Sequence, residues 1–326
     1  MTFALISRFT PRLAPLACLL ACSPAGAHAP GQNGPGPLWI AAGLVPLALL
    51  YTLGARRVWA RAGLGRGLRL EEAACFLGGL LVLALALSRP VDEVADLYFS
   101  AHMGQHLLLT LGAAPLLVLG APLYAFAWVL PLGGRRAVGR AARRLAPAWR
   151  RLSHPVSAWV ISTGVFWLWH VPALYEAAVR NGALHAFEHL NFLLSAALFW
   201  AVLLRPHGRR LGGGAGVLYL FLAALQGSLL GALLAFAPRP LYPEYARKAA
   251  EIGVDPLRDQ QLAGLVMWVP AGVVYVALAA ALFARWLADA ENAQRRRETQ
   301  AHPNQTGQIK TGQIKTHQIK THQGGG

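Results

Sequence analysis

The stretch LYFSAHMGQHLLLTLGAAPLLVL, residues 97–119, decides the fold, because it is long, apolar and contains no Asp, Glu, Lys or Arg. An α-helix rises about 1.5 Å per residue, so about 20 such residues cross the hydrocarbon core of a bilayer. Seven apolar segments of this kind occur along the chain, at residues 38–54, 73–87, 97–119, 156–170, 185–204, 217–237 and 262–287. They lack the alternation of barrel strands. The predicted fold is therefore all-α, a polytopic membrane helical bundle with seven transmembrane helices.

The composition supports a membrane protein. The 326 residues are 55% hydrophobic and 13% charged, whereas a soluble domain has about 25% charged residues. The net charge of +16 does not indicate a nucleic-acid partner, because the basic residues form neither a recognisable binding motif nor a polar domain. We interpret this charge as a marker of membrane sidedness.

Basic residues alternate from loop to loop. The segments 56–69, 132–154, 205–214 and 285–326 contain 22 Lys and Arg residues, and the alternate segments 28–37, 89–96, 171–184 and 238–261 contain 6. Because basic loops stay in the cytoplasm, the amino terminus is predicted outside and the carboxyl terminus inside. The predicted location is a bacterial inner (plasma) membrane.

The chain divides into three predicted parts. Residues 1–27 resemble a signal peptide, with two arginines before an apolar run and a small-residue pattern at 25–27. An uncleaved eighth span and a lipoprotein pattern ending at Cys22 remain alternatives. Residues 28–287 form the seven-helix transmembrane domain. Residues 288–326, with TGQIK-type repeats, are predicted to be a disordered cytoplasmic tail.

Five histidines lie inside or at the ends of the apolar segments: His102, His106, His170, His185 and His189. The first two and the last two are each four residues apart, so each pair projects from one face of a helix. Glu188 lies beside the second pair, and Pro172 ends the helix that carries the fifth histidine. The predicted topology places all five toward the outer face, periplasmic or exterior. Ionisable groups inside a membrane usually serve a function, so this pattern predicts a metal or haem site.

Three functions are compatible with these histidines. With Cys75 as the expected only thiol of the mature chain, a metal must use imidazole, thioether, carboxylate or water, and copper suits imidazole. A b-type haem between histidines of two facing helices is an alternative, in an electron carrier or haem handler. A metal-free assembly scaffold is another, with histidines as interhelical polar contacts. The sequence has no phosphate loop, nucleophile elbow or zinc-protease motif, so an enzyme is not predicted.

Three segments carry a resemblance to a known family: AHMGQHLLLTLGAAPLLVLGAP at 101–122, WHVPALYEAAVRNGALHAFEHLNFLLSAALFW at 169–200 and DQQLAGLVMWVPAG at 259–272. They resemble the signature segments of the CtaG family of cytochrome c oxidase assembly factors, the multi-span type associated with caa-type oxidases. The single-span copper chaperone that shares the CtaG name has a cysteine pair that this sequence lacks. The resemblance extends over residues 38–287.

The resemblance implies a role in maturation of a haem-copper oxidase, around copper supply or insertion. The residues that match the family are the five histidines together with Asp259, Gln260, Gly264, Met267 and Trp268. We therefore expect copper at His102, His106, His185 and His189, with His170 as an additional or exchanging ligand. Glu188 or Asp259 is expected to accept a hydrogen bond that fixes an imidazole tautomer, with Met267 and Gln260 in supporting positions. The expected partners are an oxidase subunit or a copper chaperone, and membrane lipid.

Overall fold

The structure, a computed structural model, describes residues 37–204 and 211–301, and within these ranges it is helical and contains no strand. In chain order the helices are α3 (Pro37–Ala62), α4 (Leu70–Ala86), α5 (Arg89–Leu97), α6 (Phe99–Leu107), the π-helix η1 (Leu108–Ala113), α7 (Ala114–Leu119), α8 (Pro122–Val129), α9 (Leu132–Leu152), α10 (Pro155–Trp169), α11 (Pro172–Arg180), α12 (Gly182–Leu204), α13 (Gly213–Ala235), α14 (Pro243–Glu251) and α15 (Pro256–Ala301). The predicted signal peptide and the repeats lie outside the described residues.

Each of the seven predicted apolar segments is helical, in α3, α4, α6 to α7, α10, α12, α13 and α15. In the described part of the chain, four helical stretches are long and apolar enough to cross a membrane. A fifth is added if α4 and α5, bent by 47°, count as one span. Large apolar side chains such as Leu81 and Phe236 are 71% and 77% exposed on the outside of the bundle. Such outward apolar surface indicates a membrane protein.

The last helix corrects one predicted boundary. Helix α15 continues to Ala301, so residues 288–301, which were expected to belong to the disordered tail, are helical. Their sequence, ADAENAQRRRETQA, is rich in the strong helix formers Ala, Glu, Gln and Arg. Its polarity excludes it from a membrane core but does not prevent a helix.

The third predicted span is a continuous helical stretch with a π-helical turn in its middle. Pro115 lies two residues after the end of η1, and a proline inside a helix removes one backbone donor and crowds the preceding turn. The wider π turn relieves this crowding. It also leaves the Thr110 carbonyl available to accept a hydrogen bond from the Trp200 indole N–H at 2.8 Å, which ties this stretch to α12.

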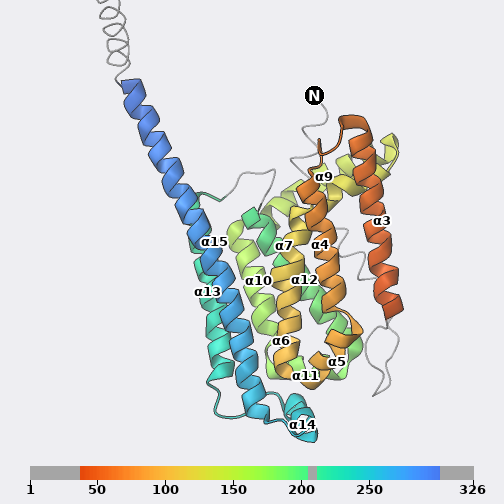
Figure 1. Cartoon of the computed structure of the whole chain (residues 1–326), viewed down its shortest axis with the longest axis vertical. Helices are drawn as coiled ribbons and strands as arrows, with labels where there is room; N and C mark the ends of the chain where they lie inside the picture. The colour runs from red at the N-terminus through yellow and green to blue at the C-terminus, as the bar shows by residue number, and fades with distance from the viewer. Residues whose placement is uncertain (1–36, 205–210, 302–326) are drawn as a thin grey trace, which may run out of the picture.

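The bundle has two distinct ends (Figure 1). The short helices α5, α11 and α14 lie at one end, and α9 lies at the other. Helix α9 occupies the predicted basic loop 132–154, and it carries seven arginines. Its charged and apolar residues separate onto different faces, which is typical of a helix at a membrane surface.

Helices α13 and α15 lie side by side along most of their shared length (Figure 1). Their contact depends on Gly231 and Gly264, because a Cβ atom added at Gly264 would lie 2.5 Å from the Gly231 carbonyl oxygen. Small residues allow helix backbones to approach closely in a membrane bundle. Helix α15 also packs along α6, which brings its amino-terminal half close to the predicted histidine site.

Candidate metal centre

The structure brings four of the five predicted histidines together from two helices. His102 and His106 share one face of α6, and their Nε2 atoms are 3.0 Å apart. His185 and His189 share one face of α12, with ring centroids 4.2 Å apart. The two pairs face each other: the ring centroids of His102 and His185 are 5.1 Å apart, and those of His106 and His189 are 5.2 Å apart. We call these four residues the histidine cluster.

Two groups of three ligand atoms in this centre could each hold a metal ion. One ligand atom from each of His102, His106 and His189 lies within 4.8 Å of the others, and the same holds for His102, His185 and Glu188. A transition metal binds imidazole nitrogen at about 2 Å, so ligand atoms around one ion lie about 3–4 Å apart. Small side-chain rotations therefore suffice to place these groups around an ion. A Glu188 carboxylate oxygen is 3.9 Å from His106 Nε2 and is close enough to take part.

Polar atoms of this centre are buried without partners. His102, His106, Glu188 and His189 are each less than 9% exposed, and His185 is partly exposed. Among the described residues, no hydrogen-bond partner exists for His106 Nδ1, His185 Nε2, His189 Nε2 and both oxygens of Glu188. Each buried polar group left unpaired costs about 1–3 kcal/mol. A bound cation would remove this cost for several of these groups at once.

Tyr245 of α14 fixes the tautomer of His102. Its hydroxyl donates to the Ala95 carbonyl at 2.7 Å and lies 2.7 Å from His102 Nδ1. A phenol has a single hydrogen and the carbonyl can only accept, so His102 Nδ1 must carry a proton and donate to Tyr245. Burial raises the pKa of Tyr245 well above its usual value, which keeps the hydroxyl neutral. The Nε2 lone pair of His102 therefore faces the histidine cluster.

The same reasoning continues to His106. Because His102 Nε2 has no proton, the 3.0 Å contact between the two Nε2 atoms requires His106 Nε2 to be the donor. His106 Nδ1 is then an unprotonated nitrogen, and it is buried without a partner. A chain of three hydrogen bonds, from the Ala95 carbonyl through Tyr245 and His102, thus determines which nitrogen of His106 is free.

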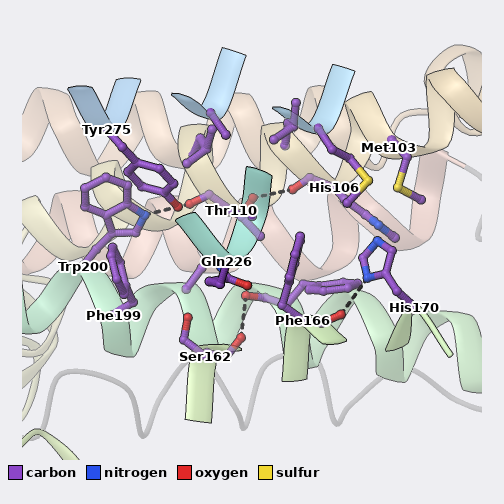
Figure 2. A pocket seen from close by; sticks show the side chains of 18 residues that line it. Met103, His106, Thr110, Ser162, Phe166, His170, Phe199, Trp200, Gln226 and Tyr275 are labelled. Atoms are coloured by element: carbon purple, nitrogen blue, oxygen red, sulfur yellow. Dashed lines mark hydrogen bonds between the residues drawn. The ribbon is translucent and has the colours of Figure 1, made fainter. Parts of the chain in front are cut away.

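His170 is not one of the residues in the two ligand groups of the histidine cluster, but it lies beside His106 at one end of an adjacent cavity (Figure 2). It follows the last residue of α10, where Pro172 starts a new helix, and its Nδ1 donates to the Phe166 carbonyl at 2.6 Å. Its Nε2 is therefore unprotonated, and it is buried without a partner. His170 shares with His106 the wall of an adjacent cavity.

That cavity has a volume of about 80 Å³ and lies between α6, η1, α10, α12, α13 and α15. Figure 2 shows Met103, His106 and His170 at one end, and Phe199, Trp200 and Tyr275 at the other. Thr110, Ser162 and Gln226 lie between them (Figure 2). Met267, predicted as a supporting residue, also lines the cavity.

The other predicted supporting residues act on the backbone. Asp259 of α15 accepts hydrogen bonds from the Phe99 and Ser100 amides, at 2.7 and 3.3 Å, and from the Ser100 hydroxyl at 2.6 Å. It caps the first turn of α6 and does not contact an imidazole, which differs from its expected role. Gln260 accepts a hydrogen bond from the Leu241 amide at 2.6 Å, which holds the loop before α14.

Short helices cover the end of the bundle that contains the histidine cluster. Lys248 of α14 forms a 2.6 Å ion pair with Asp96 of α5, and Arg180 of α11 lies 3.7 Å from Glu244 of α14. The Arg247 side chain donates to the Glu244 carboxylate and lowers its pKa. We call α5, α11 and α14 the cap. It closes the cluster from the side where the topology predicts the exterior.

Tyr245 is the site residue that the sequence analysis missed. It lies 143 residues from His102, in a short helix between α13 and α15, and no periodic pattern connects the two positions. In the sequence analysis, the segment 238–261 contributed to the count of basic residues, and only Asp259 and Gln260 in it were named as site residues.

Comparison with known proteins identifies relatives of this chain. A family model described as cytochrome c oxidase caa3 assembly factor (Caa3_CtaG) matches residues 49–289. An uncharacterized protein of Mycobacterium leprae is 26% identical over 224 residues, which are 65% of this chain and 33% of that protein. Uncharacterized proteins of Mycobacterium bovis and Mycobacterium tuberculosis are each 26% identical over 254 residues, 76% of this chain and 38% of theirs. The chain thus spans about a third of the length of these relatives. No solved structure matches it.

Proposed function

We propose, because this chain belongs to the CtaG family of cytochrome c oxidase caa3 assembly factors, that it binds copper at the histidine cluster and passes it to an oxidase subunit during assembly. The observation that carries this proposal is the group of four imidazoles and Glu188, whose buried ligand atoms converge from two helices and in part have no partner. Copper is the cargo, received from a copper chaperone or taken up directly.

The donor set favours copper over the other metals of the cell. The cluster offers imidazole nitrogen and one carboxylate, and copper forms the strongest complexes among the divalent first-row metals with such ligands. Binding at both Nε2 atoms of α6 replaces the hydrogen bond between His102 and His106, and His106 then moves its proton to Nδ1. Tyr245 supports this arrangement by holding the His102 proton away from the cluster.

The cluster contains more donors than one ion needs. Four imidazoles and a carboxylate allow an ion to keep three ligands while a fourth is exchanged for a ligand of the recipient. His185 is the most exposed of the four imidazoles, so it is the residue at which exchange would begin. A centre of this kind binds an ion tightly and still releases it to a partner that offers a replacement ligand.

We further propose that α3, α4 with α5, α6 to α7, α10, α12, α13 and α15 are seven membrane spans, with the cap outside and α9 inside. The arginine-rich α9 and the cap lie at opposite ends of the bundle (Figure 1), in agreement with the positive-inside rule. This topology directs the histidine cluster toward the periplasm or cell exterior, where the copper centre of an oxidase subunit is assembled in the proposed pathway.

The geometry favours an ion over haem. A b-type haem needs one imidazole on each side of a planar macrocycle, but the imidazoles of the cluster are in direct contact, with the Nε2 atoms of His102 and His106 3.0 Å apart and the ring centroids of His102 and His185 5.1 Å apart. The adjoining cavity, about 80 Å³, is far smaller than a porphyrin. No observation specifically favours the haem or the scaffold hypothesis, and both are outcomes of the experiment below.

The experiment is elemental analysis of copper and iron on the full-length chain, purified without a histidine tag and with His317 and His322 replaced by Asn. We expect copper near one equivalent in this protein and loss of it in the variant His102→Ala/His106→Ala. His154→Ala is the matched control, because His154 is exposed at the start of α10. Iron with a Soret absorbance band would establish haem instead. A correctly folded protein that takes up neither metal would support the scaffold.

A further inference from the structure

The cavity beside the histidine cluster contains two unprotonated imidazole nitrogens. His170 donates from Nδ1 to the Phe166 carbonyl, so its Nε2 carries a lone pair. His106 donates from Nε2 to His102, so its Nδ1 carries a lone pair. Both atoms are buried and have no hydrogen-bond partner among the described residues, and both residues line the cavity. An acceptor without a donor at this depth indicates a missing cation or hydrogen-bond donor.

Two thioethers accompany these nitrogens. Met103 is 0% exposed and Met267 is 5% exposed, they belong to one buried cluster, and both line the cavity. Figure 2 shows the Met103 sulfur at the same end of the cavity as the imidazoles of His106 and His170. Only three methionines occur in the whole chain, and two of them meet here. Packing alone does not require methionine at both positions, because leucine fills a similar volume.

The described lining of the cavity includes no Asp, Glu, Lys or Arg. A divalent ion in such an uncharged, largely apolar environment has no opposite charge to offset its lost hydration. A monovalent soft ion loses less hydration, and thioether sulfur selects Cu(I) over harder ions. The donor set of two imidazole nitrogens and two thioethers is therefore matched to Cu(I).

We propose that this end of the cavity is a second copper subsite, specific for Cu(I), with His170, Met103, Met267 and the shared residue His106 as ligands. The inference rests on the proposed copper function and extends it from one site to two. A single copper ion that moves between the subsites needs no electron transfer, because Cu(I) binds imidazole as well as thioether.

His106 makes the two subsites alternatives. When Nε2 of His106 binds an ion in the histidine cluster, the proton of the neutral ring moves to Nδ1, and this nitrogen is lost to the cavity. When Nδ1 binds an ion in the cavity, Nε2 keeps its proton and donates to His102, as in the present structure. A neutral imidazole has one proton and one lone pair, so His106 serves one subsite at a time. The cavity is therefore a second position for the copper ion, between the cluster and the interior of the bundle.

The test is X-ray absorption at the selenium and copper edges of the full-length chain, labelled with selenomethionine and loaded with Cu(I) under reducing conditions. With three methionines in the chain, a copper neighbour of selenium is readily assigned. We expect a Cu–Se signal in the wild-type sequence, a weaker Cu–Se signal in each single variant, Met103→Leu and Met267→Leu, and its loss in Met103→Leu/Met267→Leu. We also expect Cu(I) affinity to fall at least about 10-fold in this variant, as for loss of a metal-supporting contact.

A second variant separates this inference from the proposed function. His185→Ala/His189→Ala removes half of the histidine cluster but none of the cavity ligands, so it should keep the Cu–Se signal. Copper bound in the wild type with nitrogen neighbours only would overturn the second subsite and leave the cluster proposal standing. A Cu–Se signal and one copper in total, both in the wild type and in His185→Ala/His189→Ala, would overturn the cluster proposal and support the subsite. Absence of bound copper in the wild type would overturn both.

Discussion

Replacement of Tyr245 by Phe is the sharpest test of how the histidine cluster is organised. The substitution keeps the ring, which packs 5.3 Å from the ring of Phe99, and removes only the hydroxyl. His102 Nδ1–H then has no acceptor, and a buried donor without a partner costs about 1–3 kcal/mol. The imidazole avoids this cost by moving its proton to Nε2. That nitrogen faces the cluster, so its protonated form cannot bind a metal.

The metal site is weakened by a similar amount whether the His102 proton stays on Nδ1 without an acceptor or moves to Nε2. Loss of a contact that orients a metal-binding histidine typically reduces affinity about 10- to 100-fold, which corresponds to about 1.4–2.8 kcal/mol. This range agrees with the cost of the unpaired donor. We therefore expect Tyr245→Phe to bind copper about 10- to 100-fold more weakly than the wild type does. A competition titration against a chromophoric chelator measures this difference.

Tyr51→Phe is the matched control. The Tyr51 hydroxyl donates to the Gly120 carbonyl at 2.8 Å, is fully buried and lies in α3, away from the histidines. Both variants should lose thermal stability to a similar degree, but only Tyr245→Phe should lose copper affinity. If the copper affinities of the two variants differed by less than about two-fold, this result would falsify the tautomer argument.

Three further substitutions test the supporting structure. Asp259→Asn removes the charged cap of α6 and should lower stability by about 0.5–2 kcal/mol, measured by thermal unfolding in detergent; an unchanged midpoint would contradict the capping role. Gly264→Ala should destabilise by about 1–3 kcal/mol through overpacking, whereas Gly272→Ala, which meets no atom within 4 Å, should be neutral. Asp96→Asn breaks the ion pair with Lys248 and should speed copper release to a chelator by up to about five-fold. High salt should have the same effect on the wild type. A release rate that changes neither with the substitution nor with salt would show that the cap does not limit release.

The sequence predicted the helices and the histidine pairs because both depend on local patterns. Apolar runs of sufficient length fold as helices whatever lies beside them, and a spacing of four residues places His102 with His106 on one face. The sequence also predicted that the two histidine pairs lie close together, since both were assigned to the same end of the bundle. These predictions need only the period of the helix and the alternation of the loops.

The remaining features depend on contacts between distant segments. Tyr245 reaches His102 from a short loop helix, and Asp259 caps α6 across 160 residues. Neither contact leaves a periodic trace in the sequence. His170 was predicted to converge with the other histidines, but the direction of its ring, which the Phe166 carbonyl determines, could not be predicted from its depth in the membrane. The π-helical turn had a local sign in Pro115, which the sequence analysis did not interpret.

This π turn has a consequence for how the chain tolerates changes in length. A π turn holds one residue more than an α turn spanning the same interval. Deletion of a single residue between 108 and 113 that restored a regular α-helix would therefore keep the His102 and His106 face in nearly the same orientation relative to α7, which packs on α4 and α12. The same number of residues wound as a regular α-helix throughout would instead rotate that face by about 100° and turn the imidazoles away from α12. The wide turn of η1 thus holds one additional residue while the imidazoles keep facing α12.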